Sequence, residues 1–262
     1  LPRQAPLADR LGRLADVAGQ LPREGVAAAL AREVATLLDR AVGAGTGAQA
    51  LQRALAQSGL FFEARLAQGV FDPVDLKGAL LRLLARLQGP AGSAGRASGE
   101  PRPPSGGAPD AAPDPAAGVR EAMRHLVEDA LAGIRWQQIS SLPDDTGRGP
   151  IWHVGLPLRG PDDAPTTLWL RAERDADGRD PDAARWTLDL SLAVGGLGPL
   201  HARLSLRGDA LSATLWAEQE ATAGLVRDHL DLLRTGLERA GIPLAHLAAR
   251  SGRPDAAADQ PA

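Results

Sequence analysis

The stretch from Trp186 to Pro243 constrains the fold of this chain more than any other part of the sequence. Apolar and polar residues alternate with period two through three consecutive segments, which is typical of strands with one buried face. The apolar positions are Trp186, Leu188, Leu190 and Leu192, then Leu200, Ala202, Leu204 and Leu206, then Leu211, Ala213, Leu215 and Ala217. Gly208-Asp209 suits a two-residue type II′ hairpin turn, because glycine adopts a positive φ at little cost. We therefore expect a small, mostly antiparallel sheet.

After these strands the pattern changes to the period of an α-helix. One apolar stripe consists of Thr222, Leu225, Val226, Leu230, Leu233, Leu237 and Ala240. Gly241 stands where a helix often ends in the left-handed conformation, and Pro243 prevents continuation of the helix. A helix and a sheet that each have one apolar side can bury these sides against each other, so we expect this helix to pack on the sheet.

Several segments of this stretch resemble the C-terminal domain of bacterial flagellar hook-length control proteins. They are Leu197-Gly198-Pro199-Leu200, the strand with Leu204 and Leu206, Gly208-Asp209-Ala210-Leu211, and the helix end Leu237-Glu238-Arg239-Ala240-Gly241-Ile242. In that family the domain is a small α+β module that acts on the flagellar export gate. It switches the gate from rod and hook substrates to filament substrates. The resemblance implies this role for the present chain.

The first 89 residues carry apolar stripes of helical period, so residues 1–89 are expected to form an all-α region. Two interpretations of these stripes stay open: a helical bundle, or surfaces that pack against a partner or another copy. One pair of segments also resembles the helical region upstream of the switch domain in some hook-length control proteins. The pair is Ser58-Gly59-Leu60-Phe61-Phe62-Glu63-Ala64-Arg65-Leu66-Ala67 and Asp75-Leu76-Lys77-Gly78-Ala79-Leu80-Leu81.

Residues 90–117 are rich in Gly, Pro, Ala and Ser, a composition that predicts a disordered linker. We expect an α+β domain at 118–250 after it and a disordered tail at 251–262. In the resembled family a long Pro-rich and polar N-terminal half acts as the ruler that measures the hook. The Pro-rich segment of this sequence is short and lies in mid-chain, so the resemblance to the family does not extend to length measurement.

The start of the second part predicts further elements of the sheet domain. A helix is expected at 118–134, and the segment from Trp136 to Leu142 is expected to lead into the sheet. Residues 151–158 read as a strand, and Pro157 places it at a sheet edge or a bulge because proline donates no ladder hydrogen bond. A strand at 166–173 and a short final strand at 244–250 complete the expected sheet.

Composition excludes several classes of function. The formal net charge is −3, so no overall field would gather nucleic acid or an anionic membrane. All but one of the 29 basic residues are arginine, the exception being Lys77. The absence of cysteine excludes disulfides and thiolate metal sites, and no apolar run is long enough to predict a membrane span.

No motif predicts catalysis or a bound cofactor. The acidic segment Asp175–Asp182 departs from a calcium-binding loop, because its glycine falls at position four and the required glutamate is missing. The five histidines show no metal-ligand spacing, and neither a Gly-x-Ser-x-Gly nor a phosphate-binding loop occurs. We therefore expect a non-enzymatic protein without metal or cofactor. An uncharacterised enzyme is the remote alternative.

The five tryptophans all lie in the second half of the chain. Trp152 and Trp186 share the apolar positions of their strands and are expected in the core. Trp169 and Trp216 fall on the opposite face. They form either a second core layer under the helix at 118–134 or an exposed anchor for a partner.

The predicted partner-binding residues are Leu197, Gly198, Pro199, Arg203, Arg207 and Trp216. By resemblance, the expected partner is the cytoplasmic domain of the flagellar export-gate switch protein, with hook or hook-cap proteins as further candidates. The resemblance also implies the bacterial cytoplasm as location and makes the protein a candidate for export through the flagellar type III apparatus. The alternative is a needle-length or substrate-switch protein of a virulence type III secretion system.

Overall fold

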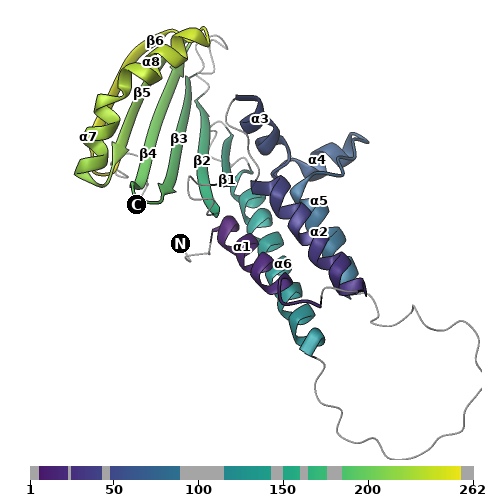
Figure 1. Cartoon of the computed structure of the whole chain (residues 1–262). Helices are drawn as coiled ribbons and strands as arrows, with labels where there is room; N and C mark the ends of the chain where they lie inside the picture. Colours follow the sequence, from purple (N-terminus) through teal and green to yellow (C-terminus); the bar gives the residue numbers. More distant parts are fainter. Residues whose placement is uncertain are drawn as a thin grey trace, which may run out of the picture.

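Helices form the first part of the molecule, and a sheet with a helical crossover forms the second, which confirms the expected α+β class (Figure 1). The computed structural model describes residues 6–22, 25–42, 48–88, 115–142, 150–159, 165–175 and 185–254. Parts of three predicted segments lie outside these residues: the linker before Pro115, the acidic segment after Asp175 and the tail after Pro254.

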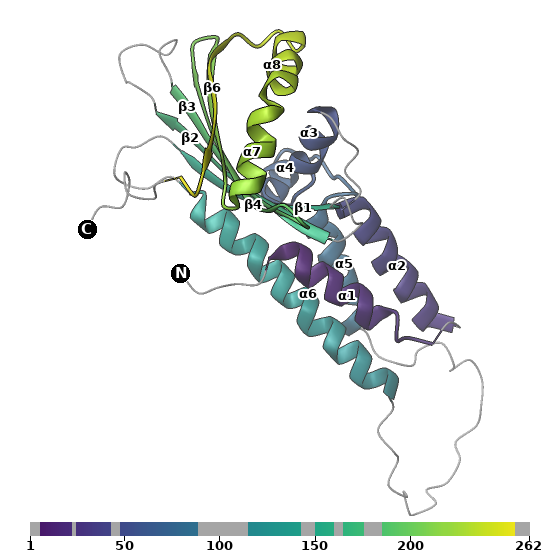
Figure 2. The ribbon, with the colours of Figure 1, turned by 60° about the vertical axis from the view of Figure 1, so that its left-hand side comes forward.

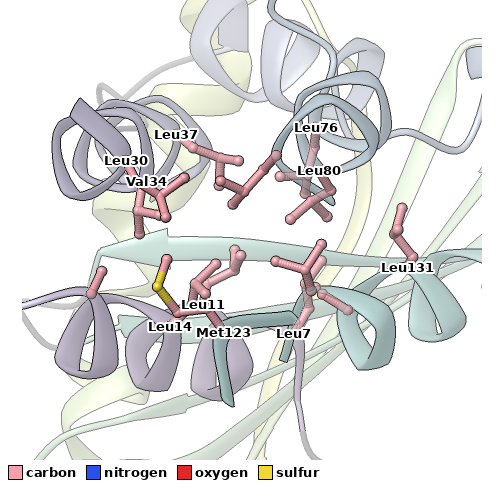
Figure 3. Packing of buried hydrophobic residues seen from close by; sticks show 14 of the residues in the cluster. Leu7, Leu11, Leu14, Leu30, Val34, Leu37, Leu76, Leu80, Met123 and Leu131 are labelled. Carbon is pink, nitrogen blue, oxygen red and sulfur yellow. The ribbon is translucent and has the colours of Figure 1, made fainter. Parts of the chain in front are cut away.

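The first part contains six helices among the described residues. They are α1 (Leu7–Ala18), α2 (Gly25–Val42), α3 (Ala48–Ala56), α4 (Phe62–Ala67), α5 (Leu76–Gln88) and α6 (Pro115–Ser140). Helices α1, α2, α5 and α6 enclose one hydrophobic core, in which their leucine stripes face one another (Figure 3). Since α6 follows the predicted linker and the other three helices precede it, the core joins both sides of the linker. The division into domains at 1–89 and 118–250 stays a prediction.

Helix α6 is longer than the sequence predicted. We expected a helix at 118–134 followed by a connecting segment from Trp136, but the helix runs on to Ser140. The buried stripe continues from Ile134 to Gln137, which is only 4% exposed. The prediction was wrong because a polar residue occupies this buried position and conceals the apolar period.

The second part is a single six-stranded sheet in the order β1-β2-β3-β4-β5-β6. The strands are β1 (Ile151–Arg159), β2 (Pro165–Asp175), β3 (Arg185–Val194), β4 (Gly198–Arg207), β5 (Ala210–Ala217) and β6 (Leu244–Ser251). Neighbouring strands are antiparallel except β5 and β6, which are parallel and joined through helices α7 (Glu220–Asp228) and α8 (Leu230–Arg239). Gly208 in the β4–β5 hairpin has φ +57°, as the turn prediction required.

Strand β1 lies at the sheet edge, as its proline predicted. Helix α6 covers this edge with polar side chains. The Gly155 N–H donates to Gln137 Oε1 (3.2 Å), and the His153 N–H donates to Ser141 Oγ (2.9 Å). An edge strand presents unpaired backbone groups to other chains, and these two acceptors occupy two of them.

The helix expected at 222–240 is divided at His229 into α7 and α8. The His229 ring Nδ1–H donates to the Leu225 carbonyl oxygen (2.8 Å), while the His229 backbone N–H bonds to Val226 instead. A side chain that takes the carbonyl four residues back competes with the helical backbone bond, which explains the division.

The predicted stop of this helix is confirmed. Gly241 has φ +73°, its N–H donates to the Glu238 carbonyl, and the Ile242 N–H donates to the Leu237 carbonyl. These two bonds form a Schellman motif, which satisfies carbonyls at the helix end.

The register of the ladders divides the sheet into two different faces. The leucine face of the central strands consists of Leu168 and Leu170 on β2, Leu188, Leu190 and Leu192 on β3, and Leu200, Leu204 and Leu206 on β4. The polar face carries Arg171, Asp189, Ser191, His201 and Arg203. Helices α7, α8 and α3 lie on one side of the sheet, and α1 and α6 lie on the other (Figure 2).

Helices α7 and α8 contact β5 and β6. The helical segment thus packs on the sheet as expected, but the leucine face of β2–β4 stays half-buried. The reason is geometric: one helix is about 10 Å wide, which is enough for about two strands at ~4.8 Å spacing.

Candidate functional site

The β3–β4 turn at Leu197-Gly198-Pro199 is held against the start of α7. Thr222 Oγ1 donates to the Leu197 carbonyl oxygen (2.9 Å), and the Glu218 N–H donates to the Pro199 carbonyl oxygen (3.2 Å). Gly198 has φ +74°, and a Cβ there would come within 2.7 Å of the Gln219 side chain. The turn is therefore an ordered surface feature whose backbone requires glycine.

Trp216 lies close to this turn on the polar face, where it pairs in register with His201. The His201 Nε2 lies 3.0 Å from Glu218 Oε1, and Arg253 Nε lies 2.7 Å from the same oxygen. The hydrogen bond from Arg253, with that from His201, lowers the pKa of the Glu218 carboxyl below its ordinary value. These contacts join β4, the β5–α7 connection and the segment after β6 beside the predicted binding turn.

Arg203 does not present an isolated cation on the polar face. Its Nε donates to Asp189 Oδ1 (2.6 Å), and Arg171 lies 3.5 Å from Asp189 Oδ2 and 2.7 Å from Glu173 Oε2. The polar face thus carries a chain of alternating charges across β2, β3 and β4, which the period-two pattern alone did not show.

The structure brings together only part of the predicted binding set. Leu197, Pro199 and Trp216 lie at one end of the β4–β5 pair, whereas Arg207 lies at the other end of β4. For an extended strand this separation is about 26 Å. A compact contact can include the turn and Trp216, while Arg207 belongs to a different part of the surface. The predicted binding role of all six residues stays a prediction.

The tryptophans on the apolar face form a stacked pair instead of a buried core. The rings of Trp152 and Trp186 stack across β2, which lies between their strands, with centroids 5.7 Å apart and planes at 15°. Trp186 is 39% exposed, so its expected core position was wrong. On the other face Trp169 packs over Gly155 near α6 yet remains 38% exposed.

The upstream segments that carry the second resemblance pack against the end of α6. Lys77 is buried, and its Nζ donates to Glu63 and to Gln138 Oε1 (2.7 Å). Gln138 Nε2 in turn donates to the Gly59 carbonyl oxygen (3.0 Å). Burial raises the pKa of Glu63, but hydrogen bonds from Lys77 and Gln138 lower it by more, so it lies below its ordinary value.

Glycines in these segments permit the close packing. A Cβ at Gly59 would approach Lys77 Cβ to 2.8 Å, and a Cβ at Gly78 would approach the Phe62 ring to 2.9 Å. The two segments therefore have a structural role in joining α4 and α5 to α6. The signal in the sequence is Lys77, the single lysine of the chain, directly before Gly78.

A pocket of about 440 Å³ lies between α2, α3, α5 and β1. Its lining includes Arg32, Arg82 and Arg86, which together suggest an anion site. Each of them already has an acceptor within the protein: the Ala28 carbonyl (3.1 Å), the Pro73 carbonyl (2.6 Å) and Glu33 (2.8 Å), respectively. The arginines thus hold the walls of the pocket in place.

The described residues contain no group of three or more His, Asp or Glu side chains that could hold a metal ion. Within the same ranges, no helix is both long and apolar enough to cross a membrane.

Comparison with protein families finds one similarity in the second part of the chain. Residues 174–258 match the model of the family described as flagellar hook-length control protein FliK. The match runs from the end of β2 through β6 and the residues that follow it, and it confirms the family predicted from the turn, the hairpin and the helix end. The similarity to the hook-length control family is therefore located in residues 174–258. No curated protein and no solved structure matches the chain.

Proposed function

We propose that the chain regulates flagellar assembly by binding the cytoplasmic domain of the export-gate switch protein. Binding changes the substrates of the gate from rod and hook proteins to filament proteins. The observation that carries this proposal is the family match at 174–258, which covers four of the six strands and both crossover helices. The protein acts in the bacterial cytoplasm by contact alone, and hook or hook-cap proteins are further candidate partners.

The contact that we assign to the gate is the turn Leu197-Gly198-Pro199 together with Trp216. The turn is ordered by the bonds from Thr222 and Glu218, so it meets a partner in one conformation. Preorganised contacts bind more tightly because little conformational entropy is lost on binding. Tryptophan next to such a turn is a residue type favoured at binding hot spots.

The test is binding of the intact chain to the purified cytoplasmic domain of the gate switch protein, measured by calorimetry. We expect Leu197→Asp to weaken binding at least tenfold, which corresponds to about 1.4 kcal/mol. The substitution leaves the backbone bonds of the turn in place, and circular dichroism checks that the fold is retained. Val70→Asp is the control, because Val70 is an apolar surface residue (52% exposed) that lies in the helical part. Absence of binding by the unchanged chain contradicts the proposal.

A further inference from the structure

The two central strands of the sheet lack a buried residue. Every residue of β3 and β4 is half-buried or exposed. By contrast, β1 buries Val154 and Leu156, and β5 buries Leu211 and Ala213, where helices cover these strands. Central strands normally pack at least one face on a core. The leucine face of β2–β4 therefore lacks a covering layer among the described residues.

Helices stand on both sides of this uncovered face. On the β1 side, Leu156 lies against residues of α2, α3 and α5. On the β5 side, α7 and α8 rise from the sheet, and Figure 2 shows them on the same side as α3. The uncovered leucine face thus lies between helices that contact β1 on one side and a helix that contacts β5 on the other, and we call this strip of three strands the groove.

The groove wall formed by α7 and α8 is also apolar. Thr222 points toward the β3–β4 turn, since its hydroxyl donates to the Leu197 carbonyl oxygen. Leu225 lies three residues further along α7 and therefore on the side of this helix that carries Thr222. It is 45% exposed, and Leu232 on α8 is 70% exposed.

The dimensions of the groove fit one α-helix. Three strands at ~4.8 Å spacing give a floor about 10–14 Å wide, and a helix with its side chains is about 10–12 Å across. Strands of ten residues give a length of about 33 Å, or six helical turns. A flat second sheet, such as that of another copy of this chain, meets the raised helices before it reaches the leucines.

A charged group marks one end of the groove. Arg174 stacks over the Trp186 ring at 5.7 Å, and Trp186 stacks on Trp152. The Arg174 Nε is buried and donates no hydrogen bond among the described residues. The guanidinium therefore lies over an aromatic ring, and its Nε has no acceptor among the described residues. A carboxylate is the group that complements it.

We propose that the leucine face binds one amphipathic α-helix of a partner protein. The helix carries leucine-like residues at spacings of three and four, and a carboxylate near the end that lies over Arg174. This surface is the face opposite Trp216, so the proposal holds for any partner with this chemistry and does not require binding of the gate through the turn.

The test uses the intact chain and three synthetic 18-residue peptides. The first has leucines at helical spacing and a terminal glutamate, the second has the same composition in scrambled order, and the third has glutamine in place of the glutamate. We expect the first peptide to bind at least tenfold more tightly than the scrambled one, as measured by fluorescence anisotropy. Arg174→Gln should weaken binding of the glutamate peptide several-fold and leave the glutamine peptide unchanged.

Neighbouring residues on β3 supply a matched pair of variants. Leu190→Asp should abolish peptide binding, whereas Ser191→Asp, on the opposite face, should not change it. If Leu190→Asp fails to fold, Leu225→Asp tests the groove wall at a residue that is already 45% exposed. Equal binding of striped and scrambled peptides overturns the proposal, as does binding that neither leucine variant reduces. Concentration-dependent dimerisation that Leu190→Asp abolishes identifies a second copy as the occupant and also overturns it.

Discussion

Asp75 shows how one buried carboxyl serves the helical part. It precedes α5, and its Oδ1 accepts the Gly78 N–H (3.2 Å), which is the position of an N-cap bond. Its Oδ2 is buried without a hydrogen-bond partner among the described residues. Burial raises the pKa of this carboxyl above its ordinary value of 3.8. The hydrogen bond to Gly78 therefore stabilises the start of α5, whereas the buried negative charge of Asp75 does not stabilise the fold.

Two substitutions distinguish the effect of the N-cap hydrogen bond of Asp75 from the effect of its buried charge. Asn is as good an N-cap as Asp, so Asp75→Asn should be at least as stable as the unchanged chain at pH 7. Asp75→Ala removes the cap and should lose about 0.5–2 kcal/mol. Urea denaturation measures both values. An equal loss of unfolding free energy in Asp75→Asn and Asp75→Ala contradicts the assignment of Asp75 as the N-cap of α5.

The same carboxyl gives a pH dependence of known sign. Its folded pKa is raised, so the folded state binds more protons between the unfolded value near 3.8 and the folded pKa. Its contribution to stability is therefore complete at low pH and is lost as the pH rises through this window. The free-energy difference between the unchanged chain and Asp75→Asn should fall across the window and then stay constant. A difference that rises with pH contradicts the raised pKa.

At the scale of elements, the contact between α6 and β1 closes one edge of the sheet. Gln137 is buried and accepts the Gly155 N–H, so replacing it with an apolar residue leaves that donor unsatisfied. We expect Gln137→Leu to cost about 1–3 kcal/mol. Hydrogen exchange of the Gly155 amide should become faster in the variant.

A neighbouring position on the same helix provides the control for Gln137. Ile139 is 67% exposed, so Ile139→Ala should change stability by less than about 0.5 kcal/mol and leave the Gly155 amide protected. Equal effects of the two substitutions would show that α6 does not close the edge through Gln137.

At the scale of the whole molecule, one core joins helices that are far apart in the sequence. Leu80 of α5 is fully buried with Met123 and Val127 of α6, and α6 also contacts β1. We expect helix and sheet to unfold in one transition, with coincident curves from circular dichroism and tryptophan fluorescence. Leu80→Ala should lower the free energy of unfolding by about 2–5 kcal/mol and shift both curves together.

The outcome of this unfolding experiment also bears on the domain division at 1–89 and 118–250. Two separate transitions, of which Leu80→Ala moves only the helical one, would support independent domains. A single shared transition would support one cooperative unit that includes α6 and the helices before the linker.

Local patterns in the chain were sufficient for the strands of the second part and for its similarity to the hook-length control family. The alternation around Leu204 and Leu206, the glycine turn at Gly208 and the Gly241 stop each depend on a few consecutive residues, because period and backbone freedom are local properties. The edge position of β1 followed in the same way from Pro157, whose missing N–H requires no knowledge of its neighbours.

Tertiary structure was required wherever the decisive contact lies far along the chain. The length of α6 depends on Gln137, whose buried polar group is explained only by the β1 edge. The contact between Lys77 and Gln138 joins residues 61 positions apart. The leucine face of β2–β4 has the pattern of a buried surface, yet it is half-buried because α7 and α8 are wide enough for only two strands. Periodicity shows which side of a strand is apolar, and only the packed arrangement shows what covers it.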